Sequence, residues 1–401
     1  MPARRPWAPC ATNSDAGARP VRLLFVTCSL PDGGAEKHTI ALLDALAQRG
    51  HECHALCIKP PRAGFENLAR STTPRSLGAD GFLDRRAIAR FAAALAQIRP
   101  EAVIAANAYA LMYTMLARRR AGLACRVVVV WHSTELPGLK EALQMVAYRP
   151  LFWAADCCVF LCQRQWRYWR LRGLISRRNE VIYNGIDLER YRDRSTVAER
   201  RQLRERLGWC ATDYVIGITA LLRVEKNHLQ LLDAIVRLQR MGLPARALII
   251  GDGVMREAIE RRVRALRLAD AVAIVGLQAD VRPWIAACDV MALCSMAEGF
   301  SLAALEAMAM GRPMVLSDVG GAAEMVVPGC NGLLFPPRDT PAFVERLAAL
   351  SDPDAARRMG ANARRVLEQR FSETRMVDRY EQLLAQLCRG AAPLAAVAMD
   401  R

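Results

Sequence analysis

The chain has 401 residues, of which 53% are hydrophobic and 24% are charged, a composition that is typical of a globular protein and excludes a disordered one. Its length favours two domains over a single core. No apolar run reaches the roughly 20 residues that span a bilayer, and the first twenty residues lack the apolar segment of a secretory signal. The net charge of +16 favours anionic partners such as phosphates, anionic lipid headgroups or nucleic acid.

The thirteen cysteines indicate a reducing compartment. Their number is odd, most of them lie in apolar strand-like runs, and no Cys-x-x-Cys pair occurs, so neither a zinc ribbon nor a thioredoxin-type site is expected. We therefore expect buried, reduced thiols in a cytoplasmic protein. Residues 1–20, which mix Arg, Pro, Asp and Gly, are expected to form a disordered tail.

From residue 21 onward, strand-like and helix-like segments alternate. The first half opens with a buried strand at 21–28, a Gly-rich turn at 31–37 and a helix at 39–49 that ends at Gly50. Further strands are expected at 51–58, 103–106, 127–131 and 156–161, helices at 85–98 and up to Leu116, a loop at 59–81, and a closing segment at 181–187.

A charged stretch at 190–206 separates this half from a second series of the same kind. Its strands are expected at 214–219, 246–250, 271–275, 290–294, 313–316 and 332–335. Strands that alternate with helices form parallel sheets covered on both faces. The chain therefore predicts an α/β fold with two Rossmann-like domains facing across a cleft, and ligands of such folds bind at the carboxyl ends of the strands.

The most informative stretch runs from Glu298 through Gly-Phe-Ser-Leu-Ala-Ala-Leu to Glu306, followed by Gly320 and Gly321. It places one carboxylate in a loop and a second one inside the helix that follows. Backbone N–H groups at a helix N-terminus, aided by the helix dipole, bind phosphate oxygens. Carboxylates on either side can accept hydrogen bonds from hydroxyl groups. A sugar nucleotide has this layout of sugar, diphosphate and ribose, so the stretch predicts a nucleotide-sugar ligand.

Five segments in order resemble the GT-B glycosyltransferases of the retaining family GT4, over residues 21–385. They are Gly33-Gly34-Ala-Glu36, the strand end at His132, Asn184-Gly-Ile-Asp187, Arg223-Val-Glu-Lys226-Asn-His228, and the Glu298 to Glu306 stretch with its two glycines. The resemblance implies a GT-B fold with an acceptor-binding domain at 21–190 and a nucleotide-sugar-binding domain at 191–372. It also implies that a helix in the final segment, 373–401, packs back on the first domain.

By this resemblance, Glu298 contacts hydroxyls of the donor sugar and Glu306 contacts the ribose. The alternatives are an acid favoured by the helix dipole for Glu298 and a solvated helix residue for Glu306. The apolar neighbours of Glu306 favour the functional role. The residues expected to bind the donor are Gly33, Gly34, Gly299, Phe300, Ser301, Leu302 and Glu306, mostly through close backbone approach.

The cations expected to act in the reaction are Arg223 and Lys226. Breaking a glycosyl–phosphate bond leaves a nucleoside diphosphate with extra negative charge, which fixed cations stabilise in the transition state. The family arginine often lies five residues before this lysine, where this chain has Leu221, so Arg223 occupies a variant position. His132 resembles the family histidine that approaches the donor sugar, and a hydrogen-bonded structural histidine is its alternative.

Three further features have more than one interpretation. Glu36 could contact the acceptor or cap its helix. The segment 163–172 interleaves three aromatic residues with four arginines, which suits a membrane-interface or anionic-acceptor helix, nucleic-acid binding, or an amphipathic helix with its aromatic residues in the core. Asp352-Pro-Asp354 has the spacing of a manganese-binding pair, but a proline at the first helical position favours capping.

The sequence therefore predicts a retaining glycosyltransferase that moves a sugar from a nucleotide-sugar donor to a glycan or lipid-linked acceptor, in cell-surface polysaccharide or glycolipid synthesis. Its expected catalytic residues are His132, Arg223, Lys226 and Glu298, with no metal, no cofactor and no nucleic-acid partner. We expect a cytoplasmic protein with peripheral association at the inner face of the cell membrane. The alternatives are a GT-B sugar-nucleotide epimerase or phosphorylase, or a basic nucleic-acid-binding protein.

Overall fold

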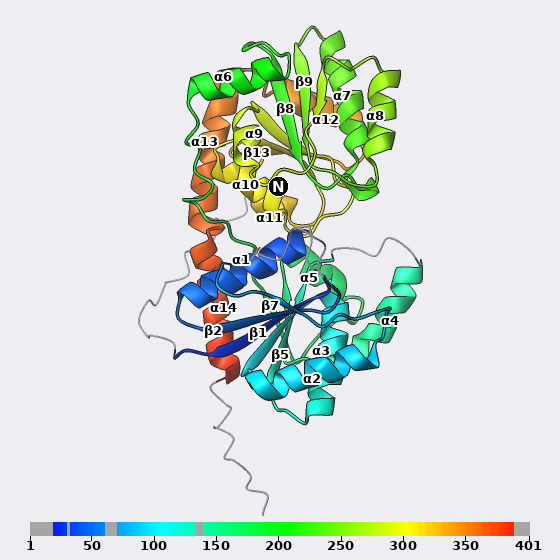
Figure 1. Ribbon diagram of the computed structural model, residues 1–401. Helices are drawn as coiled ribbons and strands as arrows, with labels where there is room; N and C mark the ends of the chain where they lie inside the picture. Colours follow the sequence, from blue (N-terminus) through cyan, green and yellow to red (C-terminus); the bar gives the residue numbers. More distant parts are fainter. Residues whose placement is uncertain (1–18, 30–32, 61–69, 134–138, 389–401) are drawn as a thin grey trace, which may run out of the picture.

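The computed structural model describes residues 19–29, 33–60, 70–133 and 139–388, and within these ranges the chain forms two parallel sheets (Figure 1). The first sheet orders its strands as β3 (Arg75–Ser76), β2 (Glu52–Cys57), β1 (Arg22–Thr27), β4 (Ala102–Ala106), β5 (Arg126–Trp131), β6 (Cys157–Phe160) and β7 (Arg178–Val181). The second orders them as β10 (Val272–Ile274), β9 (Ala245–Ile250), β8 (Tyr214–Thr219), β11 (Val290–Leu293), β12 (Met314–Ser317) and β13 (Gly332–Phe335). The expected fold of two Rossmann-like domains is confirmed.

Helices cover both faces of each sheet, so inner strands such as β4, β5 and β11 are almost continuously apolar, whereas the edge strands β3 and β7 carry polar residues. The first domain contains α1 (Gly34–Gln48), α2 (Arg85–Ile98), α3 (Asn107–Ala121), α4 (Leu139–Ala154) and α5 (Gln163–Arg170). The second contains α6 (Val197–Arg206), the 3-10 helix η1 (Val224–Lys226), α7 (His228–Arg240), α8 (Arg256–Ala265), α9 (Arg282–Ala286), α10 (Leu302–Ala309), α11 (Ala322–Met325), α12 (Thr340–Ala348) and α13 (Pro353–Arg370). Among the described residues, no helix has the length and apolar character needed to cross a bilayer.

The strand order reverses once in each sheet, between β1 and β4 in the first and between β8 and β11 in the second. Doubly wound sheets bind ligands at this point, beyond the carboxyl ends of the strands. Gly33 follows β1, His132 follows β5, Lys226 follows β8 and Glu298 follows β11. The topology therefore brings the sequence-predicted segments to the ligand-binding ends of both sheets.

Three helices differ from the expectation, and one of them, α3, runs to Ala121, five residues beyond the expected end at Leu116. α1 begins at Gly34, five residues before the expected start, so Glu36 lies in its first turn instead of in a preceding loop. α4 was not foreseen. It contains Pro150, which is unfavourable inside a helix, and its apolar residues lie on more than one side, so the sequence shows no single helical stripe. The expected tail at 1–20 lies outside the described residues except for its last two positions.

The chain passes between the two domains twice, near Ile186 and near Ser372, and these two segments lie side by side. The Ile186 N–H donates to the Phe371 carbonyl at 3.0 Å, and the Glu373 N–H donates to the Ile186 carbonyl at 2.9 Å. A side-chain carbon on Gly185 would lie 2.5 Å from the Ser372 carbonyl oxygen, so only glycine allows this approach. The Asn184-Gly-Ile-Asp187 segment is therefore a structural part of the domain junction.

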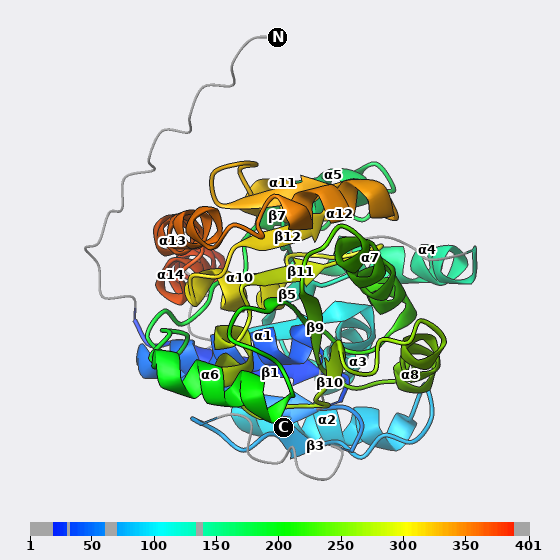
Figure 2. The same cartoon turned by 90° about the horizontal axis from the view of Figure 1, so that it is seen from above.

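The last described helix, α14 (Glu373–Cys388), packs on α1 of the first domain. α13 and α14 follow one side of the molecule in both views (Figures 1 and 2). Arg49, directly after α1, pairs with Asp378 and Glu381 at 2.9 Å each, and the ring of His51 lies 3.2 Å from Glu381. These contacts attach the C-terminal helix to the domain from which the chain started.

Candidate active site

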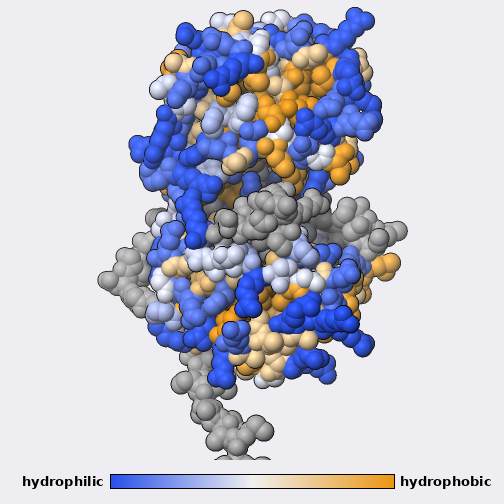
Figure 3. All heavy atoms as spheres, viewed as in Figure 1, coloured by the Kyte–Doolittle hydropathy of each residue, from blue (hydrophilic) through white to orange (hydrophobic). Residues whose placement is uncertain are grey.

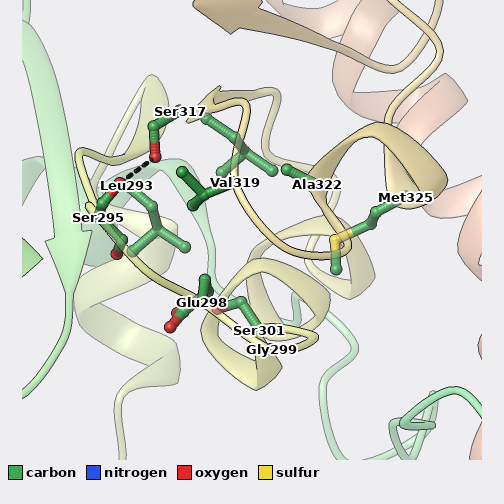
Figure 4. A pocket seen from close by; sticks show the side chains of 10 residues that line it. Leu293, Ser295, Glu298, Gly299, Ser301, Ser317, Val319, Ala322 and Met325 are labelled. Atoms are coloured by element: carbon green, nitrogen blue, oxygen red, sulfur yellow. Dashed lines mark hydrogen bonds between the residues drawn. The ribbon is translucent and has the colours of Figure 1, made fainter. Parts of the chain in front are cut away.

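The loop after β11 leads directly into the N-terminus of α10. Ser301 is the N-cap residue, because its hydroxyl accepts a hydrogen bond from the Ala304 N–H at 3.3 Å. The backbone N–H groups of the first turn, beginning with Leu302, face out of this end, where an anion is favoured. Figure 4 shows a pocket beside the turn, with Glu298 and Ser301 on one side and Val319 and Ala322 on the other.

Gly320 and Gly321 lie in close contact with residues 298–300 of this loop. Gly320 has a φ of +52°, and a side-chain carbon there would lie 1.8 Å from the Glu298 carbonyl oxygen. At Gly321 such a carbon would meet the ring of Phe300 at 2.5 Å, while the Gly321 N–H donates to the Gly299 carbonyl at 2.8 Å. The glycine pair therefore sets the path of the loop that carries Glu298.

Lys226 and Glu298 form an ion pair at 2.5 Å, and their side chains are only 19% and 20% exposed. The 3-10 helix that bears Lys226 is tied to the same loop, because the Met296 N–H donates to the Glu225 carbonyl at 2.7 Å. Arg223 is placed differently. Its side chain is 57% exposed, and the carboxylate paired with it is Glu225 at 4.0 Å. The structure thus brings Lys226, but not Arg223, into contact with Glu298.

Glu306 is buried inside α10 and accepts a hydrogen bond from the Tyr191 hydroxyl at 2.9 Å. Burial raises the pKa of Glu306, and the positive charge of Lys37 opposes that rise. Lys37 belongs to α1 of the other domain, so residues of both domains contribute to the electrostatic environment of Glu306. The sequence did not identify Tyr191 or Lys37. The only signal was a carboxylate among apolar neighbours, which must find a polar partner when it is buried.

His132 begins the loop after β5, and its backbone N–H donates to the Asn107 side-chain oxygen at 2.9 Å. Its ring lies edge-on to the ring of buried His38, with 5.2 Å between centroids. Burial, and then the nearby His38, lower the pKa of His132 well below its usual value. Burial lowers the pKa of His38 to about 4. Both rings are therefore neutral at pH 7, which suits a positioning role for His132.

In the first domain, Gly33 precedes α1 with extended backbone and Gly34 is the first helical residue. The Glu36 carboxylate lies over Gly33, where a side-chain carbon would meet it at 2.3 Å. An acidic side chain in the first turn is favoured by the helix dipole. The capping interpretation of Glu36 therefore has a physical basis in the structure, and contact with an acceptor stays a prediction.

Glu324, which follows the glycine pair, links the two domains. Its carboxylate accepts hydrogen bonds from the backbone N–H groups of Gln163 at 2.9 Å and Arg164 at 2.7 Å, which begin α5. It also accepts one from the Tyr183 hydroxyl at 2.9 Å. Nearby, the Asn184 side chain donates to the Phe300 carbonyl at 2.7 Å. The loop after β11 and the segment that contains Glu324 are thus held to the first domain by polar contacts.

The aromatic residues of the segment 163–172 pack into the first domain. Trp169 is 1% exposed and its indole N–H donates to the Ser133 carbonyl at 2.9 Å. Trp166 packs on Phe160, with 4.9 Å between ring centroids. The interpretation as an amphipathic helix with aromatic residues in the core is confirmed. Trp169 is therefore not available for the membrane or nucleic-acid contacts that were the alternatives, whereas Trp166 and Tyr168 are half-buried against the core.

Within the described ranges, no group of three or more His, Cys, Asp or Glu side chains could hold a metal ion. Asp352, in the Asp-Pro-Asp sequence, is the N-cap of α13 and accepts hydrogen bonds from the N–H groups of Asp354 at 3.0 Å and Ala355 at 3.4 Å. Asp354 pairs with Arg357. The capping interpretation of this sequence is confirmed.

Family models match both domains. The model for Glycosyltransferase Family 4 matches residues 32–190, in the seven-stranded domain, and the model for Glycosyl transferases group 1 matches residues 213–352, in the six-stranded domain that carries Glu298 and Glu306. The chain belongs to the GT4-like GT-B glycosyltransferases. Its Glu298 and Lys226 lie where the second model matches, and its His132 lies where the first one does.

The GT4-like chain is 33% identical over 180 residues to the alpha-D-kanosaminyltransferase of Streptomyces kanamyceticus, an alignment that covers 44% of this chain and 46% of the relative. It is 27% identical over 207 residues to the UDP-Gal:alpha-D-GlcNAc-diphosphoundecaprenol alpha-1,3-galactosyltransferase of Escherichia coli, over 51% of this chain and 53% of the relative. These matches span about half the length of the curated relatives. The Anabaena protein HepE, solved in complex with UDP-glucose, has a TM-score of 0.80 at 22% identity, over 91% of this chain and 100% of HepE, which shows the fold.

The GT4-like structure gathers the expected donor residues of the second domain around one helix end, with Glu298, Gly299, Phe300, Ser301 and Leu302 in sequence and Lys226 beside them. Glu306 lies on the same helix. Gly33, Gly34 and His132 belong to the other domain. The roles of these residues stay predictions, and Tyr191, Lys37, His38 and Glu324 join them from the structure.

Proposed function

We propose that this GT4-like chain is a retaining glycosyltransferase that moves a sugar from a nucleotide-sugar donor to a glycan or lipid-linked acceptor. The observation that carries the proposal is the N-terminus of α10 flanked by two partly or fully buried carboxylates, Glu298 and Glu306, with Lys226 at the first. A helix N-terminus suits a diphosphate, and the carboxylates suit the hydroxyl groups on either side of it. The names of the relatives and the ligand of HepE support this choice.

Each residue has one role in the proposed site. Glu298 binds hydroxyls of the donor sugar, and Glu306 binds those of the ribose. Lys226, and Arg223 as the second cation, stabilise the negative charge that develops on the leaving diphosphate. His132 positions the sugar from the first domain as a neutral ring, because burial keeps its pKa low.

The proposed transfer proceeds on one face of the sugar. The bond between the anomeric carbon and the phosphate oxygen breaks, the acceptor oxygen bonds to the same carbon, and the departing phosphate takes the acceptor proton. Glu298 is held by Lys226, which suits it to bind hydroxyls instead of attacking the sugar. We propose that the lysine, the arginine and the helix dipole neutralise the diphosphate without a metal ion.

We also propose that the acceptor is anionic or lipid-linked and that the chain works at the inner face of the cell membrane in polysaccharide or glycolipid synthesis. The net charge of +16 supports an anionic partner. The lipid-linked substrate in the name of the Escherichia coli relative is in accord with it.

The same donor site could serve a sugar-nucleotide epimerase or a phosphorylase. Product analysis separates these activities, because transfer consumes the donor only when an acceptor is present, whereas epimerisation does not need one.

The proposal is tested by thermal stabilisation with a panel of UDP-, GDP-, ADP- and CDP-sugars, with and without EDTA. We expect one nucleotide to raise the melting temperature in both conditions, and Glu306→Gln to weaken its binding roughly tenfold or more because a ribose contact is lost. Glu345→Gln, an exposed carboxylate on α12, is the matched control and should bind as the unaltered chain does. If no nucleotide sugar shifts the melting temperature, the transferase proposal fails. If EDTA abolishes the shift, metal independence fails.

A further inference from the structure

Helix α4 is apolar on two opposite sides. Its inward side carries Met145, Tyr148 and Phe152, which are buried. Its outward side repeats the same helical spacing with Leu143, Val146, Pro150 and Trp153, and these residues are exposed, Leu143 by 73%. An apolar face of a helix is normally buried against other parts of the protein. Among the described residues, nothing covers this outer side.

The exposed side of α4 continues onto the loop after α5. The Trp153 indole N–H donates to the Gly173 carbonyl at 3.1 Å, and Leu171 and Ile175 on either side of that glycine are 80% and 41% exposed. We call this exposed apolar surface the α4 patch. It consists of Leu143, Val146, Trp153, Leu171 and Ile175. In Figure 3, apolar surface reaches solvent at the edge of the first domain where Figure 1 places α4. An exposed apolar patch of this kind marks an interaction surface.

The surroundings of the α4 patch are strongly basic. From Leu143 to Arg178 the sequence has seven arginines and one acidic residue, Asp156. Asp156 is buried, and Arg118, Arg126 and Arg177 lie within 3.8 Å of it, so its charge is compensated. Arg149, Arg167, Arg170 and Arg172 have no carboxylate partner among the described residues.

We infer that the α4 patch is a docking surface for a bilayer that contains anionic lipid. Apolar side chains that enter the interface, with arginines around them that contact headgroups, are the combination that peripheral membrane helices use. A second copy of the chain fits less well, because two such basic surfaces would repel each other across a symmetric interface. The helix that lies in the interface is therefore α4, whereas a membrane-interface role for the segment 163–172 was one of the alternatives that the sequence left open.

The α4 patch is connected to the strand end that carries His132. The side chains of Gln165 and Trp169 in α5 donate to the Ser133 carbonyl at 3.0 and 2.9 Å, directly after His132. If the chain is the transferase proposed above, on which this step alone rests, docking through α4 would bring a membrane-borne acceptor to the loop beside the donor sugar.

The test is co-sedimentation of the full chain with vesicles of phosphatidylcholine, with or without phosphatidylglycerol. We expect binding to the anionic vesicles only, with a decrease as salt rises. Leu143→Gln/Val146→Gln should lower the vesicle partition roughly tenfold, because two inserting side chains are lost. Val197→Gln/Val254→Gln replaces two apolar residues of the second domain that are 74% and 87% exposed, at least as exposed as Leu143 and Val146 at 73% and 52%, and should bind as the unaltered chain does.

A loss of binding counts only if the melting temperature and the nucleotide-sugar shift of the variant are unchanged, and this control also separates the docking surface from the donor site. If the double variant is unstable, Leu171→Gln in the exposed loop provides the same test. The inference is overturned if the unaltered chain ignores anionic vesicles or if the α4 variant binds them equally well. It is also overturned if the patch instead holds together a dimer that the variant dissociates.

Discussion

Glu306 needs a partner from a distant part of the chain because it is a carboxylate inside an apolar helix. Tyr191, 115 residues earlier, supplies a hydroxyl at 2.9 Å. Burial raises the pKa of Glu306, while Lys37 and the Tyr191 hydrogen bond lower it. The net rise means that the ribose-binding carboxylate proposed here takes up a proton as the pH falls, and with it loses its strength as a hydrogen-bond acceptor.

Tyr191→Phe removes the hydrogen bond that favours the charged form of Glu306, so the pKa of Glu306 should rise further. Donor affinity should therefore decline at a higher pH in the variant than in the unaltered chain, and be weaker by about fivefold to tenfold on the acidic side, in line with one hydrogen bond of about 1 kcal/mol. Isothermal titration of the donor across a pH series measures this.

Tyr214→Phe is the control for that series, because the Tyr214 hydroxyl donates to the Leu347 carbonyl at 2.7 Å, outside the candidate site. Its pH profile should follow that of the unaltered chain. Identical profiles for Tyr191→Phe and the unaltered chain would show that the hydrogen bond does not tune Glu306.

At the scale of elements, α5 is a helix of one domain whose first two N–H groups are satisfied by the other domain, while the Cys162 sulfur of its own segment accepts from the Gln165 N–H at 3.4 Å. Orphan N–H groups at a helix start are usually capped by a residue of the same segment. Here the carboxylate of Glu324, a residue of α11, accepts hydrogen bonds from the N–H groups of the first two residues of α5. Arg164 and Asp318 add an ion pair across the same boundary at 2.9 Å. The orientation of the two domains is therefore coupled to the glycine pair beside the loop after β11.

Glu324→Ala should loosen the contact between the domains. We expect a radius of gyration larger than that of the unaltered chain in small-angle X-ray scattering, and a loss of about 1–2 kcal/mol of stability, as for a lost capping carboxylate. Asp339→Ala removes a capping carboxylate within the second domain, where Asp339 accepts from the Ala342 N–H at 2.9 Å. It should cost a similar amount of stability without changing the molecular dimensions. Equal dimensions for both variants would refute the coupling.

At the scale of the whole molecule, the last described helix, α14, packs on the first domain. α14 buries Met376, Val377, Tyr380, Leu383 and Leu384, and its acidic residues meet Arg49. Each such apolar side chain contributes about 1.5–3 kcal/mol when it is fully buried. The first domain is therefore incomplete without a segment from the far end of the sequence.

A chain that ends at Ser372 should lose most of this contribution, melt well below the unaltered chain and expose apolar surface to a hydrophobic dye. A chain that ends at Cys388 keeps α14 and should melt at the same temperature as the full chain. Differential scanning calorimetry of both compares them directly. Equal melting of the two truncated chains would mean that α14 adds little to the first domain.

Local sequence was enough to predict much of the fold. Buried strands with apolar runs, such as those at 127–131 and 214–219, and the helix at 85–98 with its single apolar stripe were recognised because their patterns are periodic. The start of α1 at Gly34, instead of residue 39, could not be predicted from a single apolar stripe. The same holds for α4, which contains Pro150 and has two apolar sides. The stretch from Glu298 to Leu302 was recognised because its residues are consecutive in the sequence, so the motif does not depend on the fold.

The sequence by itself determined the two parallel sheets and the order of residues from Glu298 to Glu306, since strand periodicity and a helix start depend on neighbouring residues. Only the tertiary structure decided that Lys226 and not Arg223 meets Glu298, that Tyr191 holds Glu306, and that Glu324 caps a helix of the other domain. It also decided that the aromatic residues of α5 pack inward and that α4 presents the apolar surface. Each of these depends on contacts between segments far apart in the chain, which no local pattern records.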